Sequence, residues 1–292
     1  MSADFWGNCF YGSPRQSFGE INTALFGGDL TELQALLAEK LAAADVAECC
    51  SVQAGTNRLS LLTFPASGDA RFGVLFTAQG GARPQITAIY PVLAGLPNEL
   101  SVLNYKAWDN EALGMIACQT GDGGSIGFFD PFYFRDAGGL ERGVRQRFSL
   151  AAVAYSAAIA SNDEVEIGEG PLYEDNLAEF LASHPDRRRE EFPRLVVLLG
   201  SVHMLFPTDS TGDYHYRGMI LARERLNLSG SQLWRYQICF NPDDEARTPE
   251  LWLYAADHVI QGREPNTCDY IEGYCAVSGY PLPWPDWPAA IP

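Results

Sequence analysis

The sequence predicts an α+β protein made mainly of antiparallel β-strands, and three observations lead to this prediction. Short segments of strand-like composition recur along the chain, separated by turns rich in Gly, Pro and Asn. One amphipathic segment near the N-terminus has helical spacing. The stretch 123–135 places five aromatic residues within seven positions, which is too much apolar area to leave in water. We expect this stretch at the centre of a β-rich core.

The N-terminal unit, residues 1–97, is predicted to be small, with one helix packed against a sheet. Residues 1–28 combine aromatic residues with glycines and are expected to be extended. Asp29 and Glu32 form a start that resembles a capping box, and leucines at helical spacing continue the helix to residue 44. Four strands are then expected, at residues 49–53, 58–64, 71–78 and 85–93.

The second unit, residues 98–168, begins with a predicted three-stranded meander. Its strands are expected at residues 99–108, 111–119 and 124–134. The next segment, 146–160, contains alanines that favour a helix. It also follows a Gly-rich loop and alternates in side-chain character, so we predict a strand there.

Residues 169–194 are predicted to form an acidic linker with one short helix that ends by Pro185. The last unit, residues 195–292, is again read as antiparallel strands around a hairpin. These strands are expected at residues 194–206, 213–226, 232–241, 250–256 and 270–280. The Pro- and Trp-rich tail is expected to run as polyproline II and to cover a surface with Trp284 and Trp287.

A family resemblance supports this division. The order long strand, hairpin, strand, loop, then Ile-Glu-Gly-Tyr-Cys-Ala-Val-Ser-Gly, over residues 213–280, resembles the small OB-like β-barrels of several uncharacterised bacterial families. Residues 99–160, with Phe-Phe-Asp-Pro-Phe-Tyr-Phe and Phe-Ser-Leu-Ala-Ala-Val-Ala-Tyr, resemble a diverged second copy. The resemblance implies two tandem OB-like β units that superpose. It brings no catalytic residues with it.

Charge and composition restrict the possible partners. The formal net charge of -17 repels phosphate backbones and anionic headgroups, so nucleic acid and membranes are disfavoured. Lys occurs only at Lys40 and Lys106, and almost all positive charge is Arg. Arg suits bidentate pairing with carboxylates, although a GC-rich genome explains the bias equally well.

The cysteines point to a reducing compartment. Their number is odd and most lie in apolar segments, so we expect free, buried thiols and a cytoplasmic location. The N-terminus has no signal-peptide pattern, and no segment has the length of a membrane helix. Neither zinc nor another cofactor is expected, because no Cys-x-x-Cys pair occurs. The cysteines are Cys9, Cys49, Cys50, Cys118, Cys239, Cys268 and Cys275.

The sharpest candidate binding site is the predicted hairpin at 213–240. Its candidate ligand-binding residues are Tyr214, Tyr216, Arg217, Arg223, Arg225 and Arg235. On a strand the tyrosines share one face and the first three arginines share the other, and Arg235 joins them from the partner strand. A basic stripe of this kind on an OB-like sheet binds single-stranded nucleic acid in such barrels. The favoured alternative pairs each Arg with the protein's own carboxylates, such as Glu224, Asp213 or Glu250.

Asp130 is a second candidate, as a carboxylate aimed into a cleft. It precedes Pro131, which keeps it out of a helix. We favour the alternative that its side chain caps backbone amides of a turn. The four histidines, His184, His203, His215 and His258, have no metal-binding spacing, although two or three of them near Asp213 or Asp257 would make an acid–base site.

The function predicted from these patterns is a non-catalytic module that binds a protein or a small molecule. A hydrolase-type enzyme, with an acid/His site that the sequence does not reveal, is the second hypothesis. A single-stranded nucleic-acid binder is the third. A cleft that holds carboxylates or histidines with perturbed pKa values would favour the enzyme, and an exposed patch of Arg and aromatic residues would favour nucleic acid.

Overall fold

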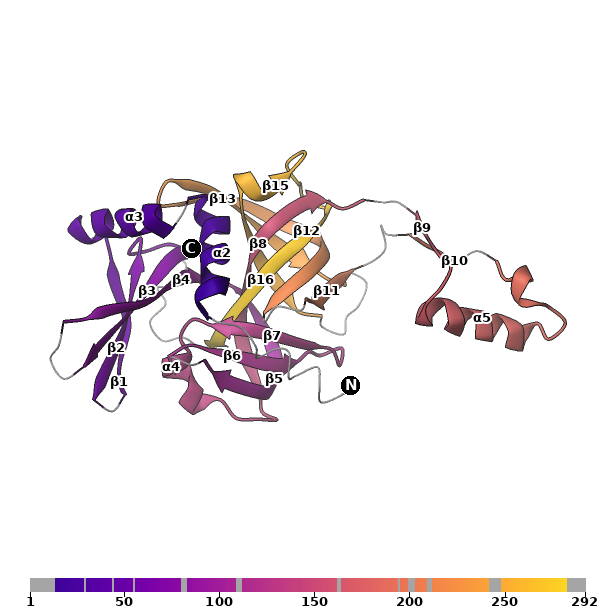
Figure 1. The fold of residues 1–292 in the computed structure, drawn as a ribbon, viewed down its shortest axis with the longest axis horizontal. Helices are drawn as coiled ribbons and strands as arrows, with labels where there is room; N and C mark the ends of the chain where they lie inside the picture. Colours follow the sequence, from indigo (N-terminus) through magenta and orange to yellow (C-terminus); the bar gives the residue numbers. More distant parts are fainter. Residues whose placement is uncertain are drawn as a thin grey trace. The chain divides into compact units, whose positions relative to one another are not determined.

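The structure is a computed structural model, and it describes most of the chain. The described residues are 14–28, 30–43, 45–54, 56–79, 83–108, 112–161, 164–193, 195–198, 203–208, 212–241 and 248–282. The chain divides into a larger unit, Met1–Ile159 with His203–Pro292, and a smaller unit, Ala160–Val202. The protein is α+β with mainly antiparallel strands, as predicted (Figure 1).

Two helices begin the described chain, α2 (Pro14–Phe26) and α3 (Leu30–Ala42). The prediction of α3 is confirmed, whereas the extended conformation predicted for residues 1–28 is wrong over α2. The apolar residues Phe18, Ile21 and Leu25 recur at helical spacing and are all buried, so α2 is stabilised by tertiary packing despite its glycine. Residues 1–13 lie outside the described chain.

The predicted N-terminal sheet is confirmed. Its strands are β1 (Ala47–Ala54), β2 (Asn57–Phe64), β3 (Ala70–Gln79) and β4 (Gln85–Leu93). They pair in sequence order and are all antiparallel. α2 packs against β4, where Asn22 Nδ2 donates to the carbonyl of Ile89 at 2.9 Å. The rings of Phe26 and Phe72 meet edge to face at 6.3 Å, so apolar contacts also join α2 to the sheet.

A ten-stranded sheet forms the rest of the larger unit. Its strands are β5 (Leu96–Ala107), β6 (Gly114–Gln119), β7 (Ser125–Asp130), β8 (Arg145–Ile159), β11 (Met204–Pro207), β12 (Asp213–Leu228), β13 (Ser231–Cys239), β14 (Glu250–Ala256), β15 (Ile260–Gln261) and β16 (Tyr270–Leu282). The strand predicted at 146–160 is therefore confirmed as β8. Strands from both the 98–168 and the 195–292 segments pair in this one sheet.

The pairings close two five-stranded rings that share β8 and β16 (Figure 1). The first ring is β5, β6, β7, β16 and β8, and the second ring is β12, β13, β14, β8 and β16. Only β7–β16 and β14–β8 are parallel within these rings. β8 pairs with β5 through residues 145–150 and with β14 through residues 151–153. The β8–β16 ribbon thus runs from one ring into the other.

The two rings repeat one connectivity. A three-stranded meander, β5–β7 or β12–β14, leads through short helical turns to a long strand, β8 or β16. The turns are α4 (Tyr133–Asp136) with η1 (Ala137–Gly139) in the first copy and η4 (Asp257–Val259) in the second. Each long strand pairs with the first strand of its own meander and the last strand of the other. Superposition of the copies, and their OB-like character, remain predictions.

The aromatic stretch 123–135 lies in the core, as expected. Phe128, Phe129 and Phe132 are buried. The ring of Phe129 stacks on Trp108 at 5.3 Å and meets Phe18 of α2 edge to face at 4.9 Å. The stretch therefore joins α2 to the first ring. The strand predicted at 124–134 ends at Asp130, because α4 begins three residues later.

The smaller unit contains β9 (Glu164–Ile167), α5 (Pro171–Ser183), η2 (Arg189–Glu191) and β10 (Leu195–Leu198). The helix predicted before Pro185 is confirmed as α5. The single strand predicted at 194–206 is wrong, because β10 pairs with β9 whereas β11 pairs with β12. The Pro/Trp tail lies outside the described residues. Of the helices that the structure describes, none is long and apolar enough to cross a membrane.

Candidate functional site

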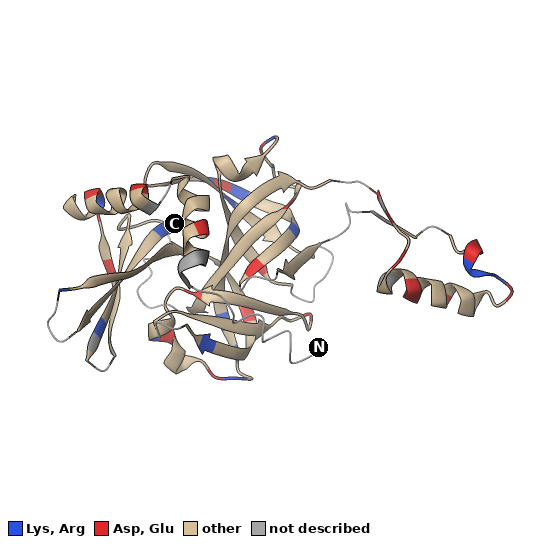
Figure 2. Cartoon of the chain, viewed as in Figure 1, with Lys and Arg blue, Asp and Glu red and all other residues tan. Residues whose placement is uncertain are grey.

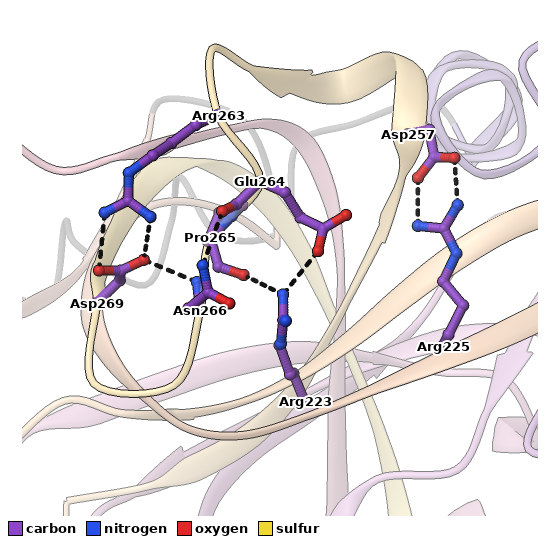
Figure 3. Close-up of polar contacts among 8 residues, drawn as sticks. All are labelled: Arg223, Arg225, Asp257, Arg263, Glu264, Pro265, Asn266 and Asp269. Atoms are coloured by element: carbon purple, nitrogen blue, oxygen red, sulfur yellow. Dashed lines mark hydrogen bonds and ion pairs between the residues drawn. The ribbon is translucent and has the colours of Figure 1, made fainter.

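The predicted arginines Arg223 and Arg225 are both paired with carboxylates (Figure 3). Arg223 Nη1 lies 2.7 Å from Glu264 Oε1 and 2.8 Å from the carbonyl oxygen of Pro265. Arg225 forms a two-pronged ion pair with Asp257, with Nη1 2.6 Å from Oδ1. The preference for pairing with the protein's own acids is therefore confirmed at these positions, although neither arginine pairs with Glu224, Asp213 or Glu250, the partners named in advance.

The loop between β15 and β16 supplies Glu264, and it is held by its own contacts. Arg263 donates to both carboxylate oxygens of Asp269, at 2.9 and 3.0 Å. The backbone N–H of Asn266 donates to the same carboxylate at 2.7 Å, as Figure 3 shows. This closed network places a carboxylate over Arg223, so the guanidinium is neutralised within the protein.

Arg235 does not share a face with Arg223. In the β12–β13 register Arg235 lies opposite Glu224, whereas Arg223 lies opposite Tyr236. Adjacent strand residues point to opposite faces, so the single basic face that we predicted is divided. Arg235 forms ion pairs with Glu224 and with Asp69, the latter at 2.6 Å.

Arg217 lies in a different part of β12, where the strand pairs with β16. It is buried and forms an ion pair with Glu272, the residue directly opposite. The register shifts between Ile220 and Ala222, and this irregularity separates Arg217 from Arg223. The bulge has no recognisable sequence signal, which is why strict alternation gave the wrong grouping.

The two predicted tyrosines hold backbone groups inside the rings. The Tyr214 hydroxyl accepts from the N–H of Gly127 at 2.7 Å and donates to its carbonyl at 3.0 Å. The Tyr216 hydroxyl donates to the carbonyl of Ser156 at 3.0 Å. Both side chains are buried, and both tie β12 to a strand outside its own meander.

Asp130 is fully buried at the end of β7, and its Oδ1 accepts from the N–H of Phe132 at 2.8 Å. The predicted turn cap is therefore present. Burial raises the pKa of Asp130 well above its usual value, and the negative charge of Asp136 raises it further. Oδ2 has no hydrogen-bond partner among the described residues. Burial and the charge of Asp136 therefore both favour the protonated form of the Asp130 carboxyl.

A groove beside α2 is a cavity with polar groups in the described part of the larger unit. Its volume is about 800 Å³. It is lined by Gly19, Glu20, Thr23, Ala24, Tyr155, Ser156, His258, Val259, Gln261 and Tyr274. These residues come from α2, β8, η4, β15 and β16. Because the apolar face of α2 turns toward the core, its adjoining face borders the groove.

A hydrogen-bonded acid pair lies at this groove. The Tyr155 hydroxyl donates to Asp213 Oδ1 at 2.9 Å. Burial raises the pKa of Asp213 from 3.8 to about 6, the hydrogen bond from Tyr155 opposes the rise, and the charge of Glu20 adds to it. The pKa of Tyr155 is raised by burial and then by Asp213. Asp213 also lines a cavity of about 20 Å³ under α2, together with Phe18 and other apolar residues.

One wall of the groove is aromatic. Tyr274 is 51% exposed, and its ring stacks on His215 with centroids 4.9 Å apart. The N–H of Tyr274 donates to Ser156 Oγ at 3.2 Å. A Cβ on the preceding Gly273 would lie 2.0 Å from the Ser156 carbonyl oxygen, so only glycine allows this close approach of β16 to β8.

Sequence reasoning did not identify Glu20, Tyr155 or Tyr274 as site residues, and it considered Asp213 only as a neighbour of histidines or arginines. Within the described ranges, no group of three or more His, Cys, Asp or Glu side chains is placed to hold a metal ion. The six cysteines in these ranges are free thiols, and Cys268 is exposed.

Comparison with protein-family models, with curated proteins and with solved structures finds no match. Function is therefore inferred from the geometry of the groove and of the arginine contacts alone.

Proposed function

We propose that this protein is a non-catalytic binding module that holds a small molecule in the groove beside α2. One observation carries the proposal: a groove of about 800 Å³ has the Tyr155–Asp213 pair beside it. Pockets for small molecules measure roughly 300–1,000 Å³ and combine apolar walls with a few placed polar groups. A carboxyl with a perturbed pKa in a cleft is a further mark of a functional site.

An enzyme is the second candidate, and Asp213 is the observation in its favour. A carboxyl that titrates near pH 6 is suited to general acid–base catalysis. Binding is preferred because Tyr155 and Asp213 already satisfy each other. A hydrolase assay on ester and amide substrates distinguishes the two, since a catalytic Asp213 requires turnover that Asp213→Asn abolishes.

The binding of nucleic acid is the least supported alternative. Arg223 and Arg225 are ion-paired, and the chain carries a formal net charge of -17. We propose a small-molecule ligand in preference to a protein, a nucleic acid or a membrane. A reducing, cytoplasmic location is also proposed, and it is supported by the free thiols of the adjacent Cys49 and Cys50.

The test is a crystallographic fragment screen with two variants at Gly19. A Cβ at Gly19 meets no atom within 4 Å, so Gly19→Ala fits without displacement and Gly19→Trp projects a large side chain into the groove. We expect fragments to cluster in the groove of the wild type and of Gly19→Ala, and to be lost from Gly19→Trp. Fragments that cluster elsewhere in all three proteins would contradict the proposal.

A further inference from the structure

Among the residues that the structure describes, the groove beside α2 is lined by an acid and by no Arg or Lys. Glu20 projects from α2, and Asp213 is reached through the groove-lining Tyr155. Among the ten lining residues, His258 is the sole side chain that can become cationic. Asp and Glu residues are also spread over both units (Figure 2). A negative field of this kind concentrates positive ligands and repels anions.

The charge of Glu20 acts on the Tyr155–Asp213 pair. The charge of Glu20 raises the pKa values of both Asp213 and Tyr155, so the three groups are close enough to interact electrostatically. A negative charge near Asp213 disfavours the ionised form of Asp213, and a positive charge beside it has the opposite effect. A single cation would therefore interact favourably with both acids at once.

Other lining residues suit the rest of such a ligand. Tyr274 is half-exposed, and its ring is held in place by stacking on His215. Aromatic faces attract ammonium groups within about 6 Å of the ring centroid, and they also pack against apolar groups. Val259 and Ala24 add apolar surface to the lining.

We propose that the groove binds an organic ammonium ion with a compact apolar or aromatic body. The charged nitrogen is directed to Glu20 and the Tyr155–Asp213 pair, and the body lies toward Tyr274. This inference rests on the proposed function, because it takes the groove as the ligand site.

Several titratable groups surround the proposed ammonium position. They are Glu20 on α2, Tyr155 on β8, Asp213 and His215 on β12, His258 on η4, and Cys275 on β16. A cation favours the ionised form of Asp213, so affinity should rise as the pH increases through about 6. A comparison of the pH dependence of affinity between the wild type and Asp213→Asn isolates the contribution of Asp213.

The experiment uses three probes of nearly equal size: benzylamine, benzyl alcohol and benzoate. Binding to the full-length protein is measured by titration calorimetry near pH 7.5, and each probe is also soaked into crystals. We expect benzylamine to bind in the groove at least about tenfold more tightly than either other probe. Glu20→Gln should weaken benzylamine by about tenfold. The matched control Glu39→Gln, which removes one exposed charge from α3, should not.

The outcomes separate the two proposals. If benzyl alcohol or benzoate occupies the groove as tightly as benzylamine, the ammonium inference is overturned while the groove remains the ligand site. Equal weakening by Glu20→Gln and Glu39→Gln also overturns it, because the preference would then reflect net charge alone. If neither these probes nor the screened fragments enter the groove, both proposals fail.

Discussion

Replacing Asp213 with Asn is expected to stabilise the protein near neutral pH. The folded protein raises the pKa of this carboxyl from 3.8 to about 6. A raised carboxyl pKa contributes stability that is fully present below the unfolded pKa and is lost as the pH rises through the folded pKa. Asn resembles the protonated carboxyl, and its Oδ1 can still accept the hydrogen bond from Tyr155. The stability of the variant should therefore not fall as the pH rises through about 6, whereas that of the wild type should.

The size of this effect follows from the shift. A rise from 3.8 to about 6 corresponds to about 3 kcal/mol over the whole titration, at about 1.4 kcal/mol per pKa unit. The loss begins as the pH rises through the unfolded pKa of 3.8, so slightly more than half of it occurs below about pH 5. About 1.4 kcal/mol of it falls between about pH 5 and about pH 8.

Urea denaturation of both proteins across this pH range measures the effect. We expect the free energy of unfolding of Asp213→Asn, minus that of the wild type, to grow by about 1.4 kcal/mol from about pH 5 to about pH 8. Asp269→Asn is the control, since Arg263 and the N–H of Asn266 lower the pKa of Asp269, so its difference should be flat over this range. A flat difference for Asp213→Asn as well would refute the electrostatic reasoning.

Three further results are expected. Tyr214→Phe should destabilise the protein by about 2 kcal/mol in urea denaturation, because it removes the hydroxyl that bonds to the backbone of Gly127. Tyr236→Phe should be neutral or stabilising, because the buried Tyr236 hydroxyl has no partner among the described residues. Equal losses of stability in the two variants would contradict this reasoning. In the same assay Arg235→Ala should lower the free energy of unfolding by about 3 kcal/mol, because its ion-paired side chain is only 11% exposed. Arg263→Ala should lower it by less than about 0.5 kcal/mol, because its side chain is 59% exposed. A larger loss for Arg263→Ala than for Arg235→Ala would contradict this expectation. A labelled single-stranded oligonucleotide should show no micromolar binding by fluorescence anisotropy at physiological salt, and salt-sensitive micromolar binding would restore the nucleic-acid hypothesis.

The elements of the fold were largely predictable because their signals are local. Alternating residues and Gly-rich turns marked the meanders. In 146–160 the alternation predicted a strand although the alanines favour a helix, and the strand is confirmed as β8. The closure of the rings was not predictable, since it depends on β8 pairing with β16. Residues such as Ile159 and Ile271 pair across more than a hundred positions of the chain, and nothing local specifies that partner.

The candidate site was less predictable than the fold. Glu20, Tyr155, Asp213 and Tyr274 come from four distant segments, and the two patterns that contain Tyr155 and Tyr274 indicate a fold rather than a chemistry. The arginines of β12 were conspicuous because a cluster of one charge is visible in sequence, but the carboxylates that neutralise them are not adjacent. Arg225 and Asp257, for example, are paired across 32 positions. The sequence therefore pointed to the arginines of β12, whose charges are neutralised by carboxylates, and not to the groove.

The groove depends on elements that the two copies do not share. Both copies supply a meander and a long strand, but α2 lies outside the repeat, and the short strand β15, which pairs with β8, occurs only in the second copy. The repeated strands bring Tyr155 and Asp213 together, whereas α2 adds Glu20 and buries part of the pair. Asp213 is expected to cost stability there, and a group kept at such a cost in a cleft is better explained by ligand binding than by folding. Knowledge of the repeated fold alone would not have located the groove, because part of its lining comes from α2 and β15, which the two copies do not share.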